Sequence, residues 1–277
     1  MGLRINTNVS SIAAQRMLGQ TTNRLNSNFR KLSSGERITR SADDAAGLAI
    51  SEKLKAQIRG IRQARRNADD GISLIQTAEG GLSEVSNIVI RLRELAIQSA
   101  SDTVGDTERG FSNIEFQQLK DEMQRIAQSS DFNGRKLLDG TGGQVEIQVG
   151  IHNDAFNDRI TYDASKISST LEELGLTGEA VSSKESAQLS LSKLDDALVQ
   201  INGSRAELGA LQNRLTSVVQ TLGVTEENFS QANSRIRDVD VASETADMAK
   251  NQILAQAGTS VLAQANQAPN FALKLLG

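Results

Sequence analysis

Apolar residues recur along two long stretches of the chain at alternating spacings of four and three positions. The first stretch runs from residue 54 to residue 96 and the second from residue 191 to residue 236. Each keeps a single phase for six heptads or more, which is typical of a coiled-coil helix. We therefore predict two long continuous helices whose rod seam contains Leu54, Ile58, Ile72, Ile75, Leu82, Leu194, Leu198, Ile201, Leu208 and Leu215.

The length of the second helix bears on the shape of the molecule. A helix over residues 187–236 spans ~75 Å at a rise of 1.5 Å per residue. A compact globule of this chain length has a diameter of roughly 50 Å. We therefore predict a mainly α fold, built as an elongated antiparallel coiled-coil rod.

Shorter helices flank the two long ones. Gly35 is placed to end an N-terminal helix, and the capping-box pattern from Ser41 to Asp44 is placed to begin the first long helix. A third helix is predicted from Phe116 to Ile126 and a closing helix from Val241 to Ala265. Between them, alternation at Val145, Ile147, Ile160 and Tyr162 predicts a β-hairpin near residues 144–163.

This order of elements brings the two ends of the chain together. We predict a terminal coiled-coil domain from residues 1–40 and 240–277 and a rod domain from residues 41–239, with no large outer domain. Each terminal helix has more apolar surface than one partner helix covers, so copies of the chain are the expected further partners. The residues expected to pack there are Ile5, Val9, Ile12, Leu18, Leu25, Leu254, Val261, Leu262, Leu273 and Leu276.

The amino-acid composition argues against several classes of function. Hydrophobic residues make up 38% and aromatics 3%, which suits narrow helical seams better than a broad core. The net charge of −4 argues against nucleic acid, and the chain has no cysteine for disulfides or thiolate sites. No stretch approaches the ~20 apolar residues of a membrane span, and the first residues lack a secretory signal pattern. Neither a membrane partner nor a cleaved signal peptide is expected.

The residues also argue against an enzyme. His152 is the one histidine and lies in a polar turn, so zinc chemistry that needs two histidines is excluded. Asp43 and Asp44 form a carboxylate pair, but helix capping accounts for both. Neither GTGG nor AEGG is followed by the Gly-Lys-Ser/Thr of a phosphate-binding loop. We expect no catalytic residues, no cofactor and no metal.

Several long blocks of the sequence resemble bacterial flagellin. The similarity covers roughly residues 3–138 and 186–277, and it departs at Gly277, where an arginine is common, and in the stretch FSNIEFQQL. The clearest blocks are KLSSGERITRSADDAAGLAISEKL, DDGISLIQTAEGGLSEV, RLRELAIQSA, SRIRDVD and QILAQAGTSVLAQANQAPNFALKLLG. The chain looks like a short flagellin, and the alternatives that stay open are a hook-filament junction protein and a coiled-coil signalling hairpin.

The resemblance implies a subunit of an extracellular flagellar filament, with the terminal helices in the innermost tube. It also implies export through the flagellar type III apparatus, with an export chaperone, a cap protein and hook-junction proteins as partners. Arg91, Leu95 and Glu115 fall where many flagellins contact the vertebrate Toll-like receptor 5.

Charged residues interrupt the first long seam at fourteen-residue intervals, at Arg65, Glu79 and Arg93. Two interpretations stay open. The three side chains extend to solvent from a seam shared with another helix, or they fix the register of the helices.

Overall fold

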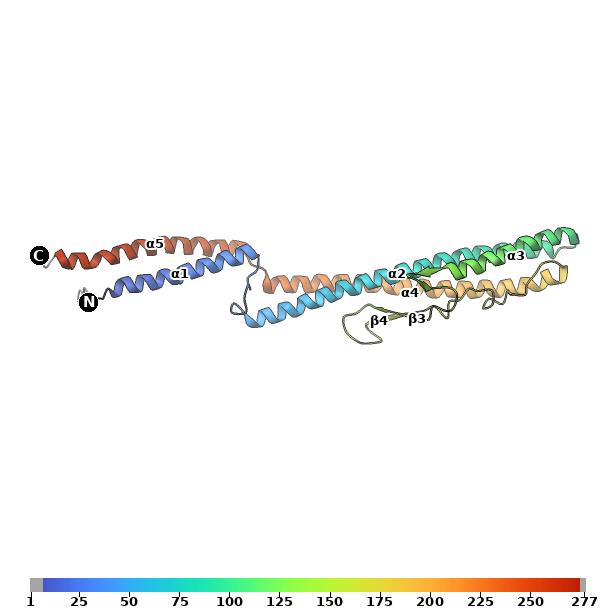
Figure 1. Ribbon diagram of the computed structural model, residues 1–277, viewed down its shortest axis with the longest axis horizontal. Helices are drawn as coiled ribbons and strands as arrows, with labels where there is room; N and C mark the ends of the chain where they lie inside the picture. The colour runs from blue at the N-terminus through green and yellow to red at the C-terminus, as the bar shows by residue number, and fades with distance from the viewer. Residues whose placement is uncertain (1–6, 275–277) are drawn as a thin grey trace. The chain divides into compact units, whose positions relative to one another are not determined.

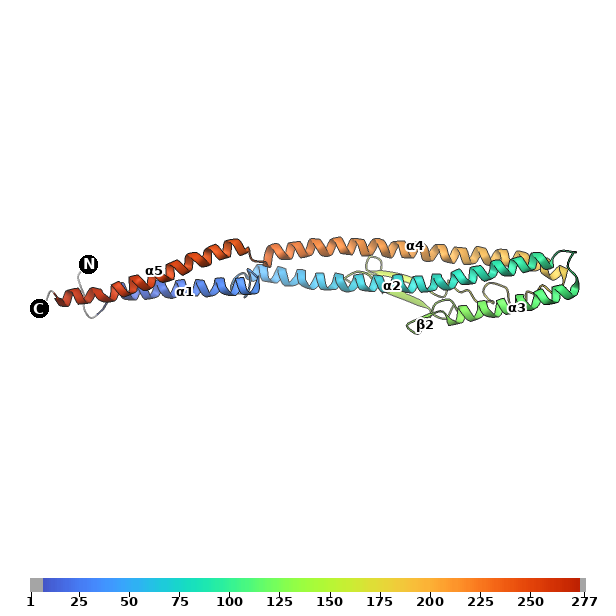
Figure 2. The same ribbon diagram turned by 90° about the horizontal axis from the view of Figure 1, so that it is seen from above.

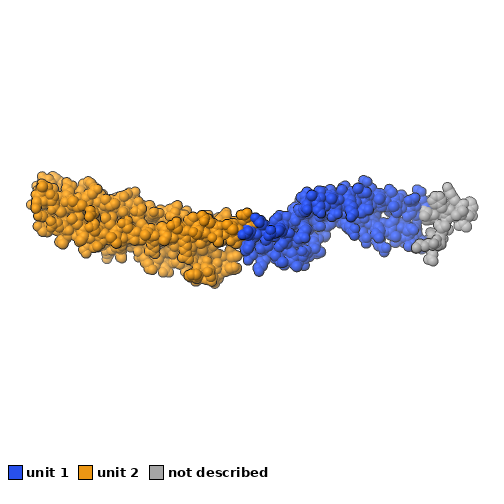
Figure 3. All heavy atoms as spheres, turned by 180° about the vertical axis from the view of Figure 1, so that it is seen from behind, with its two compact units in different colours: residues 1–57, 228–277 blue, residues 58–227 orange. Residues whose placement is uncertain are grey.

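The computed structural model describes the backbone of residues 7–274 and the side chains of residues 7–267. The chain forms two compact units, which are coloured in Figure 3: residues 1–57 with 228–277 are unit 1, and residues 58–227 are unit 2. The helices are α1 (Val9–Ser34), α2 (Ala45–Ser99), α3 (Asp106–Ser129), α4 (Lys184–Arg237) and α5 (Val241–Lys274), and the strands are β1 (Asp131–Phe132), β2 (Arg135–Lys136), β3 (Gln144–Gln148) and β4 (Arg159–Asp163).

Unit 1 is built around α1 and α5, which lie side by side in both ribbon views (Figures 1 and 2). Asn8 caps the start of α1, where its Oδ1 accepts a hydrogen bond from the Ser11 N–H at 3.0 Å. Gly35 ends the helix in the left-handed region at φ 71°, as the sequence predicted. The pairing of the terminal helices is therefore present within one chain.

The first long helix begins three residues later than a cap at Ser41 predicts. Asp44 is the capping residue of α2, and its Oδ1 accepts from the Gly47 N–H at 2.8 Å. Asp43 is not free to cap the helix, because its Oδ2 accepts from the Thr39 N–H at 3.0 Å and closes the preceding turn. Both carboxylates still lie at the positive end of the helix dipole.

Arg237 joins three segments within unit 1. Its guanidinium is hydrogen-bonded to the carboxylate of Glu52 on α2, and its Nε lies 2.8 Å from Glu36 Oε1 in the segment after α1. The Arg237 carbonyl O accepts from the Arg37 N–H at 2.6 Å. The end of α4 is thus held to the start of α2 and to the segment that leaves α1.

Unit 2 contains most of both long helices, and α3 packs beside them (Figures 1 and 2). Ion pairs from Arg62 to Glu226 and from Arg93 to Asp195 show that α2 and α4 run antiparallel. Both helices are continuous across the predicted stretches, including Gly223 and Thr225 in α4, so that prediction is confirmed. The mainly α fold with a small antiparallel hairpin is confirmed as well.

The predicted hairpin is formed by β3 and β4. The strands pair antiparallel, with Ile147 opposite Ile160 and Val145 opposite Tyr162. Ile160 and Tyr162 are buried against α2, and a Cβ added at Gly71 of that helix would lie 2.6 Å from Ile147 Cδ1. A larger residue at position 71 would therefore require the Ile147 side chain to shift where the hairpin packs on α2.

A second, shorter hairpin was not predicted. β1 and β2 pair antiparallel around Asn133 and Gly134, whose φ angles of 51° and 77° are those of a two-residue turn. The Asn-Gly dipeptide is the strongest short hairpin signal, but the strands on either side are only two residues long and show no alternation.

Candidate functional site

The first residues of α1 are held to α5 by polar contacts. Asn8 Nδ2 donates to the Ala265 carbonyl O at 2.7 Å, and Ser11 Oγ donates to Asn266 Oδ1 at 2.7 Å. Ser11 is buried although it is polar. Low-numbered residues of α1 thus meet high-numbered residues of α5, which makes the pair antiparallel.

A second polar cluster lies between the last turns of α1 and the first turns of α5. Asn251 Nδ2 donates to Asn28 Oδ1 at 2.9 Å, and Asn28 Nδ2 donates to Glu244 Oε1 at 2.6 Å. Lys31 Nζ lies 3.6 Å from the same Glu244 oxygen. The two asparagines are only 7% and 9% exposed, so buried amides occupy this end of the interface between α1 and α5.

Large apolar side chains lie mostly outside this interface. Among the described residues of unit 1, those that are about half exposed or more are Val9, Ile12, Met17, Phe29, Ile50, Val241, Ile253, Leu254 and Val261. Isolated exposed apolar residues are normal, but such a set on two paired helices is typical of a protein-protein interface. We call the members on α1 and α5 the exposed apolar set.

The ten residues predicted to pack at the chain ends divide into three groups. Leu18, Leu25 and Leu262 are half-buried in the seam between α1 and α5. Ile5 and Leu276 lie outside the described residues, and Leu273 belongs to α5 but its side chain is not described. The remaining four belong to the exposed apolar set: Val9, Ile12, Leu254 and Val261.

The predicted rod seam lies where α2 and α4 meet. Leu54, Ile72 and Leu198 are half-buried there. The buried members are Ile58, Ile75, Leu82, Leu194, Ile201, Leu208 and Leu215. In unit 2, Ile75, Leu82, Leu208 and Leu215 belong to one hydrophobic cluster with α3 and the β3–β4 hairpin. Leu194 and Ile201 belong to a second cluster with α3.

Two of the three charged interruptions of this seam form ion pairs across it. Arg65 Nη1 lies 3.1 Å from Glu226 Oε2, and Arg93 Nε lies 2.6 Å from Asp195 Oδ1. Both arginines extend to the edge of the interface, with 44% and 41% of their side chains exposed. Ion pairs at this exposure contribute little free energy but favour one register.

The predicted receptor residues lie on α2 and α3. The Arg91 guanidinium donates to Glu115 Oε1 from Nε at 3.0 Å and from Nη2 at 2.8 Å, and to Glu94 from Nη1 at 2.9 Å. The carboxylates of Glu94 and Glu115 raise the pKa of Arg91 above its ordinary value. Leu95 is 2% exposed and points into the core, so Arg91 and Glu115 are the accessible members.

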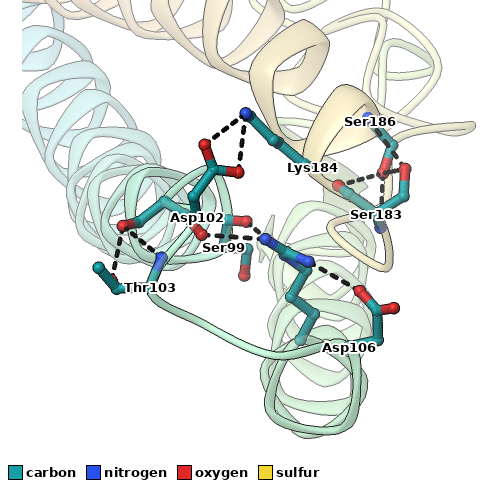
Figure 4. A network of polar contacts seen from close by, with 9 residues as sticks. Ser99, Asp102, Thr103, Asp106, Ser183, Lys184 and Ser186 are labelled. Atoms are coloured by element: carbon teal, nitrogen blue, oxygen red, sulfur yellow. Dashed lines mark hydrogen bonds and ion pairs between the residues drawn. The ribbon is translucent and has the colours of Figure 1, made fainter.

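The end of unit 2 where α2, α3 and α4 meet is closed by a polar network (Figure 4). Lys184 Nζ lies 2.8 Å from Asp102, and this hydrogen bond lowers the pKa of the Asp102 carboxyl. Arg109 is 8% exposed, and its guanidinium donates from Nη2 to the Ser101 carbonyl O at 2.9 Å. The network holds the last turn of α2 against the starts of α3 and α4.

Two further residues that were weighed as candidate catalytic groups, His152 and Asp43, lie in segments that make local structural hydrogen bonds. His152 is exposed in the loop between β3 and β4, and its carbonyl O accepts from the Gln148 amide. Asp43 accepts a hydrogen bond from the Thr39 hydroxyl, which lowers the pKa of its carboxyl. Among the described residues no group of three or more His, Cys, Asp or Glu side chains is arranged to hold a metal ion. No helix in the same part of the chain is both long and apolar enough to cross a bilayer.

Comparison with known families identifies the chain. The N-terminal helical region of bacterial flagellin matches residues 5–142, and the C-terminal helical region of bacterial flagellin matches residues 191–276. The chain belongs to the bacterial flagellin family. Flagellins are structural proteins, so the chain is a structural subunit and not an enzyme.

Individual relatives match along the whole chain. A flagellin from Halalkalibacterium halodurans is 45% identical over 98% of this chain and 99% of its own length. A flagellar filament core protein from Treponema maltophilum is 43% identical over the same shares, and the flagellin of Bacillus subtilis is 39% identical over 99% and 100%. The chain and these relatives match over nearly their whole lengths, and a short form of flagellin without a large outer domain fits the 277 residues of this chain.

Two solved structures share the fold. The crystal structure of Bacillus cereus flagellin superposes with a TM-score of 0.51 at 34% identity, over 57% of this chain and 88% of that chain. A protein assigned as a flagellar hook-associated protein from Vibrio parahaemolyticus superposes with a TM-score of 0.59 over 71% and 100%, but at 16% identity. The second similarity shows the fold alone.

Sequence reasoning missed the buried asparagines of flagellin unit 1. Asn28 follows Leu25 by three positions and precedes Leu32 by four, so it occupies an apolar position of the heptad pattern. That position was a signal in the sequence, but only the structure shows that Asn251 lies opposite.

Proposed function

We propose that this flagellin polymerises into an extracellular bacterial flagellar filament through the exposed apolar set on α1 and α5. The observation that supports this proposal is the exposure of large apolar side chains on helices that are already paired: Val9 is 65% exposed, Ile12 58%, Ile253 66% and Val261 56%. In water these side chains favour a further apolar partner. A second copy of the same chain supplies one.

The free energy gained by burying the exposed apolar set supports this proposal. Burying one Val, Leu or Ile side chain stabilises an association by about 1.5–3 kcal/mol. Several such residues per copy, repeated at every contact along a filament, exceed the cost of about 4–15 kcal/mol for immobilising one subunit. Because α1 and α5 contact each other largely through small and polar residues, the exposed apolar set remains available for contacts with another copy.

The layering of the filament follows the predicted domains. Residues 1–40 and 240–277 form the innermost tube in this proposal, and residues 41–239 form the surrounding rod domain. Ile5, Leu273 and Leu276 pack in the tube together with the exposed apolar set. The α2–α4 seam is already buried within one chain, so the rod needs no neighbour in order to fold.

In this proposal the exposed apolar set also explains why the chain needs protein partners during export and at the growing end of the filament. Before assembly the exposed apolar set needs cover, which a flagellar export chaperone supplies in this proposal. Export without a cleaved signal peptide delivers the chain outside the cell. There, hook-junction proteins present the first matching helices and a cap protein retains new subunits at the growing end.

Electron microscopy and sedimentation test the polymerisation proposal. The purified chain at high concentration is expected to form long tubes, and a chain lacking residues 260–277 is expected to stay monomeric. Circular dichroism of the truncated chain is expected to show only the helix loss of the missing residues. Normal filaments from the truncated chain would refute the role of the terminal helices. Short assemblies without tubes from the full chain would favour the alternative, a hook-filament junction protein.

A second proposal concerns the ion pair between Arg91 and Glu115. Both side chains are about half exposed and lie on neighbouring helices, so they form an accessible charged surface. We propose that this surface is recognised by the vertebrate Toll-like receptor 5 when flagellin is monomeric. Arg91→Ala is expected to weaken activation of receptor-bearing reporter cells, and Arg125→Ala, which removes an exposed ion pair elsewhere on α3, serves as the control. Equal activation by the two variants would refute the contact.

A further inference from the structure

The seam between α1 and α5 is a heptad pattern made mostly of small and polar residues. On α1 the buried and half-buried residues recur at spacings of three and four, and on α5 they do the same. These residues are Ser11, Ala14, Leu18, Thr21, Leu25, Asn28 and Leu32 on α1, and Glu244, Met248, Asn251, Ala255, Gly258, Leu262 and Ala265 on α5.

Apolar contacts in this seam specify the register of the two helices only weakly. Leu18, Leu25 and Leu32 are spaced by seven, so a slip of one heptad places two of the three leucines where another had been. One α5 residue opposite Leu18 is Gly258, where an added Cβ would lie 3.3 Å from Leu18 Cδ1. A leucine fits opposite a small residue in more than one register.

The amide pair distinguishes the native register from its neighbours. With Asn28 opposite Asn251, each buried amide has a partner, and Glu244 accepts the second donor. A slip of one heptad brings Asn251 opposite Thr21 or Gly35. The slip to Gly35 also brings Asn28 opposite Gly258, so both buried amides lose their side-chain partner, which is unfavourable. In the slip to Thr21 the threonine hydroxyl already donates its proton to the Met17 carbonyl O at 3.0 Å, so it can accept from Asn251 but cannot donate to it. The amide pair of the native register is lost in both slips.

We propose that Asn28 and Asn251 are positioning residues that fix the register of α1 against α5. They thereby fix where Val9, Ile12 and Met17 lie along the helix pair relative to Ile253 and Val261, the residues that the next copy contacts in this proposal. This inference rests on the proposed polymerisation through these helices. A single buried asparagine pair has the same effect in other coiled coils, where it selects one register at a cost in stability.

The test replaces both amides by an apolar side chain of similar size. Asn28→Leu/Asn251→Leu is expected to keep the helix content and to keep or raise the thermal midpoint of the purified chain, because a leucine pair packs well in a helix seam. The critical concentration for polymerisation is nevertheless expected to rise by about tenfold or more, since slipped registers become accessible. An unchanged or lower critical concentration would overturn the inference.

A control variant separates register from added apolar surface. Asn26→Leu/Gln252→Leu adds the same two leucines near the amides, but at exposed positions outside the seam. Its critical concentration is expected to stay close to that of the unmodified chain. If the control raises the critical concentration as much as the seam variant does, added surface explains the effect and the inference is refuted.

Cross-linking reports the register directly, because the chain has no cysteine of its own. The Cβ built at Gly258 lies 4.0 Å from Leu18 Cβ, within the range of about 3.5–4.5 Å that a disulfide spans. Leu18→Cys/Gly258→Cys is therefore expected to cross-link in the native register. Leu25→Cys/Gly258→Cys reports a slip of one heptad, and it is expected to cross-link only when both asparagines are replaced.

The native cross-link also provides a rescue. In the Asn28→Leu/Asn251→Leu background, oxidised Leu18→Cys/Gly258→Cys is expected to restore the lower critical concentration, and reduction is expected to remove the effect. Absence of both the slipped cross-link and the rescue would overturn the register role while the unmodified chain still polymerises. Failure of the unmodified chain to polymerise would instead refute the proposed function, so the two failures are distinguishable.

Discussion

Arg109 on α3 closes the carbonyl end of α2, where its Nε donates to the Ser99 carbonyl O at 2.9 Å. The same guanidinium donates from Nη1 to Asp106 Oδ1 at 2.7 Å, so it bridges the end of one helix and the start of the next. The last carbonyls of a helix have no partner within it. In flagellin unit 2 a side chain from the following helix supplies the donor for one of them, the Ser99 carbonyl.

Replacement of this guanidinium tests its contribution. Arg109→Met keeps the length and apolar stem of the side chain but leaves the buried Ser99 carbonyl without its donor. We expect a loss of about 2–4 kcal/mol in the free energy of unfolding, measured by urea denaturation followed by circular dichroism. Arg125→Met, which removes an exposed ion pair from α3, is the control and is expected to cost less than about 1 kcal/mol. Equal losses for the two variants would contradict the capping role.

Two leucines of the α2–α4 seam are expected to differ in their contribution to stability. Leu194 is fully buried, whereas Leu198, one turn further along α4, is half-buried. We expect Leu194→Ala to cost about 2–5 kcal/mol in the free energy of unfolding and Leu198→Ala distinctly less, since part of its side chain stays in water. Denaturant midpoints of the two variants provide the measurement, and a larger cost at Leu198 would contradict the observed phase of the seam.

The stability of unit 2 is expected to depend on pH in the alkaline range because of Tyr162. Its hydroxyl donates to the buried Leu137 carbonyl O at 2.9 Å, and burial, with the nearby charge of Asp163, raises its pKa from 10.0 to about 12. The folded chain therefore keeps the phenol protonated at a pH where the unfolded chain loses the proton. The resulting stabilisation is fully present below pH 10 and is lost as the pH rises from 10 towards 12.

The single tyrosine makes this titration directly measurable. Ultraviolet absorbance of tyrosinate reports Tyr162 alone, because the chain contains one tyrosine. We expect a midpoint near 12 for the folded chain and near 10 in denaturant. Tyr162→Phe is expected to remove this part of the alkaline loss of stability. A folded-state midpoint near 10 would show that the phenol is not held as the structure places it.

The exposed apolar set is tested by adding one charge at two neighbouring positions of α5. Ile253→Lys places an ammonium group in the proposed interface, whereas Gln252→Lys adds the same charge at an exposed polar position next to it. We expect Ile253→Lys to raise the critical concentration for polymerisation by about tenfold or more, because an apolar contact is lost and a charge is desolvated. Gln252→Lys is expected to change it far less, and thermal unfolding of the monomer should be similar for both. Similar filament yields from the two variants would place the interface elsewhere.

Part of the candidate site was predictable and part was not. The sequence indicated that both terminal helices carry more apolar surface than one partner covers, and it named Val9, Ile12, Leu254 and Val261, which the structure exposes. It grouped these residues with Leu18 and Leu25, which lie in the intrachain seam. The apolar positions of such a helix do not by themselves say which of them face the partner helix in the same chain and which face another copy.

By itself the sequence determined the long continuous helices, the hairpin near residues 144–163 and the family. Heptad phase and strand alternation are local properties, so they survive without knowledge of the partner segment. Only the tertiary structure decided that Asn28 meets Asn251, that Arg109 reaches the Ser99 carbonyl and that Leu95 points inward. Each of these depends on which residue of a distant helix lies opposite, and that register is fixed by packing in three dimensions.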